Sequence, residues 1–384
     1  MLTAKSKQCI CDNIFGVTAE HCDATTAYLC KYKSRLDQPA RFRINSRDVS
    51  FEDSVAFAAD LITNACAPAI FGFEHLGLAN QQACVDLAKM AKAHIALNDK
   101  PDGSIWRQGK VTATLGESLD RSDLVVCLGC DPAKKHPRIF KLFQQLNKPV
   151  RFLSIGENNQ FEISSRCSPL NANQLLEFLA LVELSLYNDK HLKVLRQDHL
   201  ESVRAVAEQL TRANHVSFLY DTDLLILINE FTPVLDQLVS LAKCLHTKTK
   251  CVVLDVSNRI NELGAENALS WSTGFANAVS FSGPVPIVSN DAELCDVHIH
   301  ICDENSLPQI KSTAEGILIS TSKAPLSSDQ FKLIIENMSP FPDDFVRFDD
   351  AICELQFAET QGEKINNFLK WIRAVKSQIS RKIA

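Results

Sequence analysis

Short apolar runs separated by helical patterns constrain the fold of this chain more than any other feature. Two clear examples are Leu124–Leu128 and Cys251–Val256. The others lie at 68–73, 150–155, 215–220, 296–302 and 316–320. A strand that is apolar along its whole length is buried on both faces, as in a parallel sheet covered by helices. Helical patterns fill the intervals, at 50–62, 80–92, 138–146, 173–186, 199–213 and 223–245. We therefore predict an α/β protein with parallel sheets and right-handed crossovers.

The pattern changes along the 384 residues in a way that predicts two α/β lobes with a smaller segment at each end. The predicted segments are 1–48, 49–168, 169–322 and 323–384. Alternation in Ala40–Ile44 is typical of short strands, so we expect the first segment to be a small β-rich lobe. The regular rhythm is lost in the last segment, which ends in an amphipathic helix over 363–382. We expect this helix to pack on its own domain or on a partner subunit.

Charge and hydropathy exclude several classes of protein. The net charge of −6 and the pI of about 6.0 disfavour a protein that binds nucleic acid through phosphate contacts. The basic residues near Met1 precede no apolar run, so no signal peptide is expected. The longest apolar stretch, Leu224–Ile228, is far too short to span a membrane. We expect a cytoplasmic protein that contacts neither membrane nor nucleic acid.

Fourteen cysteines are many for such a chain, and a reducing compartment would keep them as thiols or metal ligands. Four near the N-terminus can be read as ligands of an iron–sulfur cluster, which needs four thiolates. They are Cys9, Cys11, Cys22 and Cys30. Against this, a C-x-C pair lacks the usual spacing of two thiolates on one metal. Four others lie in apolar runs and are expected in the core: Cys84, Cys127, Cys244 and Cys251.

The predicted strand at 296–302 carries His298, His300 and Cys302 on one face, because strand side chains alternate. These three side chains have the chemistry of a zinc site. The alternative, which we favour, is that Val297, Ile299 and Ile301 face one layer of the core while His298 and His300 face a polar seam.

A polar loop, 131–138, directly follows the strand Leu124–Leu128 and precedes a helical pattern. Ligands of α/β proteins bind at the carboxyl ends of parallel strands, so Asp131, His136 and Arg138 are candidate anion-binding residues. Equally, Pro137 can simply start the helix and Asp131 cap a turn. The common phosphate-binding, zincin and hydrolase motifs are absent from the sequence.

Several collinear segments resemble the B subunit of formylmethanofuran dehydrogenase, a member of the molybdopterin oxidoreductase superfamily. Together they span about residues 9–320. The matching runs are Cys11–Ile14, Thr114–Glu117, Arg121–Val126, Asp131–Pro132, His136–Arg138, Asn261–Gly264 and Leu269–Gly274. The resemblance implies two α/β lobes of the molybdopterin-oxidoreductase kind. In that family the cofactors are molybdopterin, with tungsten or molybdenum, and an iron–sulfur cluster.

This sequence departs from the family at the positions that hold those metals. Ala4 and Lys7 stand where the first two cluster cysteines belong, which leaves Cys11 and Cys22 as relics. No cysteine lies between Cys84 and Cys127, where the family places its metal-binding cysteine. The pterin domain expected after Ser320 is short or missing. Asp131, His136 and Arg138 would then be vestigial cofactor-binding positions, and no cofactor is expected.

The pattern resembles the B subunit of the bacterial formyltransferase/hydrolase complex. That resemblance implies a scaffold without redox activity, in tetrahydromethanopterin-linked conversion of formaldehyde to formate. Amidohydrolase-type and formyltransferase subunits would be its partners. Two alternatives stay open: a working molybdopterin oxidoreductase subunit, and an unrelated α/β ligand-binding protein.

Overall fold

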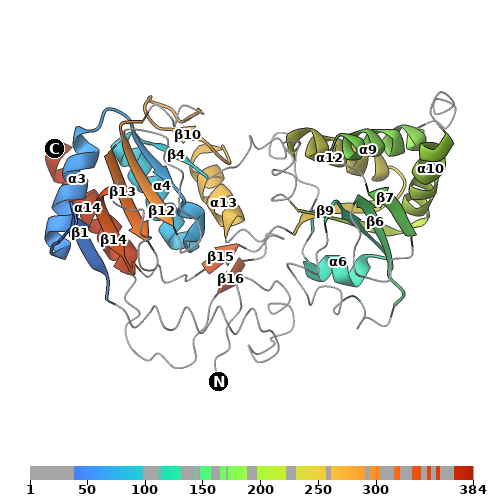
Figure 1. Ribbon diagram of the computed structural model, residues 1–384, viewed down its shortest axis with the longest axis horizontal. Coiled ribbons are helices and arrows are strands. Elements are labelled where there is room, and N and C mark those ends of the chain that lie inside the picture. Colours follow the sequence, from blue (N-terminus) through green and yellow to red (C-terminus); the bar gives the residue numbers. More distant parts are fainter. Residues whose placement is uncertain are drawn as a thin grey trace, which may run out of the picture.

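The strands form two large sheets in separate lobes and one small hairpin (Figure 1). A computed structural model of the chain describes the following residues: 39–97, 112–113, 115–130, 143, 148–156, 165–169, 172–187, 197–221, 231–256, 261–289, 295–302, 315–320, 331–338, 344–346, 352–354 and 367–383. The α/β class predicted from the apolar runs is confirmed.

The first sheet has nine strands in the order β11-β10-β4-β3-β12-β13-β14-β1-β2. Its centre, from β4 to β14, is parallel, and the strands at both edges are antiparallel. The strands are β1 (Arg41–Ile44), β2 (Arg47–Asp48), β3 (Pro68–Phe71), β4 (His94–Ala96), β10 (Val279–Ser280), β11 (Ile287–Val288), β12 (Val297–Cys302), β13 (Glu315–Ser320) and β14 (Phe331–Glu336). The sheet is therefore mixed, and parallel only where both of its faces are buried.

Four helices pack on one face of this sheet: α3 (Phe51–Asn64), α4 (Leu78–Ala91), α13 (Glu262–Thr273) and α14 (Asn367–Ile383). Their apolar residues form one core with the isoleucines and leucines that alternate along the strands. Ser50 caps α3, since its hydroxyl accepts a hydrogen bond of 3.0 Å from the Asp53 N–H. A short 3-10 helix, η2 (Phe73–His75), joins β3 to α4.

Helix α14 is the amphipathic helix predicted over 363–382, and it packs on α3 and α4 of its own lobe. Trp371 is fully buried in that contact, and its indole N–H donates to the Ser54 hydroxyl at 3.2 Å.

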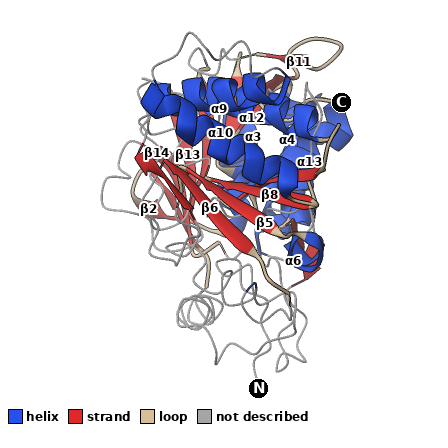
Figure 2. Ribbon diagram, turned by 90° about the vertical axis from the view of Figure 1, so that its right-hand side faces the viewer, coloured by secondary structure: helices blue, strands red, loops and turns tan. Residues whose placement is uncertain are grey.

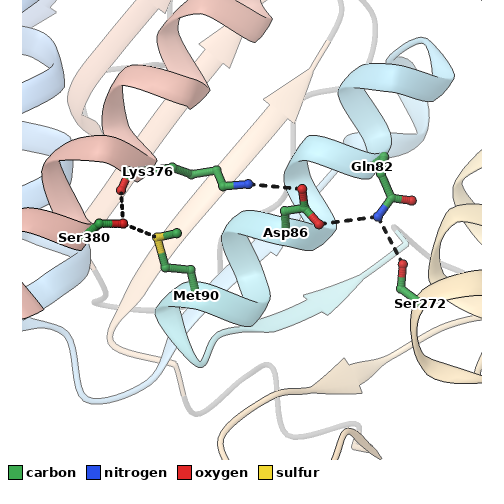
Figure 3. Close-up of polar contacts among 6 residues, drawn as sticks. All are labelled: Gln82, Asp86, Met90, Ser272, Lys376 and Ser380. Carbon is green, nitrogen blue, oxygen red and sulfur yellow. Dashed lines mark hydrogen bonds and ion pairs between the residues drawn. The ribbon is translucent and has the colours of Figure 1, made fainter.

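Polar contacts on the outer side tie the helices together (Figure 3). Lys376 of α14 lies 3.1 Å from Asp86 of α4, and Gln82 of α4 donates to Ser272 of α13 at 3.1 Å.

The second sheet has five parallel strands in the order β7-β6-β5-β8-β9. The strands are β5 (Leu124–Leu128), β6 (Arg151–Gly156), β7 (Ser165–Pro169), β8 (His215–Tyr220) and β9 (Lys250–Asp255). Three helices share a core with one face: α9 (Ala172–Tyr187), α10 (Gln197–Arg212) and α12 (Phe231–Leu245). Helix α6 (Leu115–Arg121) lies on the opposite face (Figures 1 and 2).

Strand pairing divides the chain differently from the boundary predicted at 168/169. All five strands of the second sheet come from residues 124–255, whereas the first sheet combines strands before and after that range. The second lobe is thus an insertion between β4 and α13. The prediction assumed that strands consecutive in sequence share a sheet, and a long insertion breaks that assumption.

Two further expectations about the ends of the chain were wrong for the described residues. β1 forms as predicted, but it pairs antiparallel with β14 at the edge of the large sheet and not in a separate lobe. Regular structure also continues beyond residue 323. β14, at Phe331–Glu336, is a full strand of the large sheet and lies between β13 and β1. The remaining described strands, β15 (Asp344–Val346) and β16 (Ile352–Glu354), form the small hairpin. The helix predicted at 138–146 lies almost wholly outside the described residues.

None of the helices in the described part of the chain combines the length and apolar composition needed to cross a membrane.

Candidate functional site

The strand order of the second sheet creates a switch point between β5 and β8. From β5 the chain moves outward through β6 and β7, then returns to the other side of β5 as β8 and continues to β9. Connections leave β5 and β8 in opposite directions, so a crevice is expected at their carboxyl ends. Gly129, at φ 59°, turns the chain there, and its N–H donates to the carbonyl of Ile155 on β6 at 2.7 Å.

Three acidic or thiol side chains meet at this edge. Cys130 follows β5, Asp221 follows β8, and Asp255 ends β9. The Cys130 thiol is buried and donates to the Leu219 carbonyl at 3.3 Å. Burial raises the pKa of Cys130 well above its usual value, and the nearby Cys127 and Asp221 raise it further. The thiol is therefore protonated at neutral pH and is a poor metal ligand or nucleophile.

Asp131, His136 and Arg138 begin directly after Cys130 in the sequence but lie outside the described residues. Their role in binding an anion stays a prediction. The side chains described at this edge include two carboxyl groups and a neutral thiol, and no cation. By themselves they do not fit the phosphates of a pterin dinucleotide cofactor, which require cationic or N–H donors.

Sequence reasoning missed Asp221 and Asp255, although a signal exists. Each carboxyl group directly follows or ends an apolar strand, in Tyr220-Asp221 and Leu254-Asp255. Only the strand order shows that these positions converge on Cys130.

The second region of interest is the face of the nine-stranded sheet opposite the helices α3, α4, α13 and α14. The register places His94, His298 and Phe331 in one row across the strands, and Phe71 and His300 in the next row on that face. Gly316 lies between His298 and Phe331 in the first row. All three histidines are buried.

Aromatic rings surround these histidines. The His300 ring stacks on Phe71 with centroids 5.0 Å apart and meets Phe331 edge-on at 5.9 Å. The His298 ring lies 5.5 Å from Phe71 and 5.6 Å from His300. Ile299 and Ile301 face the helix-covered core, as predicted. The polar seam expected for the histidines is instead an aromatic layer. Phe71 lies on the adjacent strand β3 and Phe331 on β14, one strand further away on the other side, and the sequence did not align either strand with β12.

Burial keeps both strand histidines neutral. It lowers the pKa of His300 to about 3, and the neighbouring His298 contributes to that shift. Burial also lowers the pKa of His298. A hydrogen bond to the Cys295 carbonyl and the charge of Asp296 act to raise that pKa, but burial outweighs them. Neither ring nitrogen of His300 has a hydrogen-bond partner among the described residues. A buried imidazole of this kind is neutral at physiological pH and cannot serve as a general acid there.

Metal ligands do not gather in the described part of the chain: no three His, Cys, Asp or Glu side chains there are placed to hold one ion. Cys302 packs with Leu318, Phe331 and Ile334, all from strands. The relic candidates Cys11 and Cys22 lie outside the described residues. Cys84, Cys127, Cys244 and Cys251 are buried thiols, as expected.

Asp123, within the run Arg121–Val126, has an architectural role. Its carboxylate accepts hydrogen bonds from the N–H groups of Asn214 and His215 at 2.9–3.1 Å, which fixes the start of β8 beside β5. Partial burial would raise the pKa of Asp123, but these bonds outweigh it and hold the pKa below its usual value. Asp296 does the same between β12 and β3, accepting from the N–H groups of Cys66 and Ala67 at 2.7 and 2.9 Å.

The run Asn261–Gly264 forms a buried polar junction where α13 starts. The Asn261 amide donates to the Leu76 carbonyl at 2.6 Å, and the Asn261 carbonyl accepts from Gln81 at 2.9 Å. A Cβ at Gly264 would lie 2.3 Å from Asn261 Oδ1, so only glycine fits.

The run Leu269–Gly274 ends the same helix, with Gly274 at φ 81° as its cap. Both runs thus shape α13.

No protein-family model matches the chain, and no curated protein matches it in sequence. Among solved structures, the chain is similar to a chain in the X-ray crystal structure of the formyltransferase/hydrolase complex (FhcABCD) from Methylorubrum extorquens in complex with methylofuran. The TM-score is 0.70 at 14% sequence identity, and the match covers 89% of this chain and 99% of that chain. At this identity the likeness establishes a shared fold.

Proposed function

We propose that this chain is a structural subunit of a formyltransferase/hydrolase complex in one-carbon metabolism, corresponding to its B subunit and located in the cytoplasm. The observation that carries the proposal is the shared fold over 89% of this chain and 99% of a chain of that complex. The partners would be subunits of the formyltransferase and amidohydrolase types. Transfer and hydrolysis of formyl groups would take place on those partners.

The family motifs that remain in the described residues support a scaffold. Asp123 joins two strands, Asn261 and Gly264 join α13 to α4, and Gly274 ends α13. Each of these contacts maintains the fold and none of them places a reactive group in an open site.

The sequence supports the absence of a redox centre. Ala4 and Lys7 replace two cluster cysteines, and residues 85–126 contain no cysteine. A tungsten or molybdenum centre without a sulfur ligand loses its protein anchor, and a cluster without four thiolates loses its ligands.

Purification of the native complex through a tag on this chain tests the proposal. Mass spectrometry of the co-purified chains should identify formyltransferase-type and amidohydrolase-type subunits. Elemental analysis of this chain expressed alone should find no stoichiometric molybdenum, tungsten or iron. Stoichiometric metal in the isolated chain would overturn the scaffold role, and purification of the chain without partners would favour an unrelated ligand-binding protein.

One observation favours a second candidate, a subunit that retains molybdopterin chemistry. The switch point between β5 and β8 is the position at which α/β sheets bind ligands, and Asp131 follows it directly in sequence. Formate oxidation measured with an artificial electron acceptor distinguishes the two. Turnover by the complex that is lost in the His136→Ala and Arg138→Ala variants would support this candidate over the scaffold.

A further inference from the structure

Exposed large apolar side chains concentrate in one short segment of the described residues. Five of the eight come from residues 271–288. They are Trp271, Phe275, Val285, Ile287 and Val288. We name these five side chains the hairpin surface, because they lie on the β10–β11 hairpin and on the end of α13 that leads into it.

The hairpin forms the edge of the nine-stranded sheet and is exposed on both faces. Val288 is paired with Val279, whose side chain is buried on the helix-covered face, so Val288 points to that side. Ile287 is paired with Ser280 and points to the other side. Both side chains are nevertheless exposed. The strand pair therefore projects beyond the helical layer at the end of the sheet.

Charge is absent from this segment. No residue from 267 to 290 is charged, in a chain of which 22% is charged. Exposed edge strands are normally protected by charged residues, and apolar edges without them are typical of binding surfaces. Trp271 is 62% exposed and Val285 is 65% exposed, so each has a large area available for burial by a partner.

The chemistry of the segment favours a protein partner over a membrane. No lysine or arginine occurs from 260 to 310. One lysine from elsewhere in the chain, Lys92, is placed near the hairpin because it directly precedes Ala93, whose carbonyl accepts a hydrogen bond from the Phe281 N–H. A surface that inserts into an anionic bilayer carries basic residues among its apolar ones. Pro286 precedes β11 and has no N–H, which opposes extension of the sheet by the same strand of a second copy.

We propose that the hairpin surface is the docking site for a different subunit, which covers it with an apolar, uncharged face. This inference rests on the proposed function, because it assigns the surface through which the chain would join the complex. Side chains carry the contact, with Trp271 and Val285 as its anchors. Because burial of apolar area stabilises such a contact, it should be insensitive to salt.

Substitution of Val285 provides the test, with tagged full-length chain isolated from its native cells. Val285→Lys and Val285→Glu each place a charge in the apolar contact, and both should reduce recovery of the partner subunits by roughly tenfold or more. Ile383→Lys is the matched control, since Ile383 at the end of α14 is 64% exposed and lies outside the hairpin surface. That variant should recover the partners as the wild type does. Thermal unfolding of the three variants should match the wild type, because every substituted side chain is exposed.

The outcomes separate the two proposals. Recovery of the partners by the wild type and equally by both Val285 variants would overturn the docking site and leave the proposed function intact. Failure of the wild type to recover formyltransferase-type or amidohydrolase-type subunits would overturn the proposed function, and the docking site with it. A wild-type dimer by light scattering that Val285→Glu dissociates would assign the surface to a second copy. Binding to phosphatidylcholine/phosphatidylglycerol vesicles that Val285→Lys strengthens and Val285→Glu abolishes would assign it to a membrane; both results contradict the proposal.

Discussion

The ring of His300 stacks on the ring of Phe71, with centroids 5.0 Å apart and an interplanar angle of 16°. The two residues are paired on neighbouring parallel strands, so the stack links β12 to β3 within the buried face of the sheet. His300 therefore packs as an aromatic core residue, but unlike phenylalanine its imidazole ring can be protonated.

We predict that His300 makes the stability of the fold depend on pH. Its pKa is about 3 in the folded chain and near 6.5 when unfolded, so the unfolded state binds more protons between these values. Stability is full above pH 6.5 and falls as the pH drops below it, by up to about 2 kcal/mol between pH 7 and 5.

Urea unfolding of wild type and His300→Phe at pH 7 and pH 5 measures this effect. The phenylalanine variant should be at least as stable at pH 7 and should lose less stability at pH 5. His246→Phe, at an exposed position, is the control. An unchanged pH dependence in His300→Phe would contradict the assignment.

Gly316 allows the Phe331 ring to lie across the sheet toward His300. A Cβ at residue 316 would lie 2.5 Å from Phe331 Cδ1. Because Phe331 is buried, its ring has little room to move, and we expect Gly316→Ala to reduce the free energy of unfolding by about 1–3 kcal/mol. Phe331→Leu in the same chain should recover part of that loss. Chemical denaturation of the two single variants and the double variant tests the coupling, and strictly additive effects would show that the two sites are independent.

Asp123 and Asp296 should contribute stability that is lost in acid. Hydrogen bonds to backbone N–H groups lower the pKa of each carboxyl in the folded chain, in spite of partial burial. Such a contribution is present above the unfolded pKa and is lost as the pH falls through the folded pKa. Asp123→Asn and Asp296→Asn should each cost about 1 kcal/mol at pH 7, because partial exposure screens the carboxylates.

Acid titration of unfolding, followed by circular dichroism, would detect the change as a shallower dependence on pH in each variant. Asp86→Asn serves as the control. In the contacts described for α4, the Asp86 carboxylate accepts hydrogen bonds from the side chains of Lys376 and Gln82 and from no backbone N–H. Equal behaviour of all three variants would argue against a special role of the two strand-joining carboxylates.

Two residues of α14 should differ widely in their effect on stability. Trp371→Ala removes a fully buried ring and leaves a cavity between α14 and α3, at a cost of about 3–5 kcal/mol. Lys376→Ala breaks the partly exposed ion pair with Asp86 and should cost under about 1 kcal/mol. Differential scanning calorimetry of the two variants measures the contrast, and a small effect of Trp371→Ala would show that α14 contributes little to the core.

The sequence predicted elements well where the hydrophobic pattern is local. β5 and β8 have the predicted bounds, and α14 begins within four residues of its predicted start. β14 was missed because Lys332 interrupts its apolar run and no helical pattern frames it. Such a strand is recognisable only from its neighbours in the sheet.

Pairing between distant strands leaves no local trace in a sequence. β3 pairs with β12 although Ala67 and Asp296, which directly precede these strands and are joined by a hydrogen bond, are 229 positions apart. For the same reason the aromatic layer around His300 and the convergence of Asp221 with Cys130 were not predictable. Both depend on sheet order, which the alternation of apolar residues does not encode.

The insertion of one lobe into the other also sets an order of events during synthesis. β3 leaves the ribosome long before its partner β12, and at common elongation rates the delay is roughly ten to forty-five seconds. The five-stranded lobe is complete within that interval and can fold first, as a unit of mostly nearby contacts. Nascent chains arrested once residue 256 has emerged from the ribosome should therefore hold a protease-resistant second lobe beside β3 and β4, which can pair with each other but still lack their outer partners β12 and β10. The apolar outer edges of these two strands are the natural binding site for a chaperone at that stage.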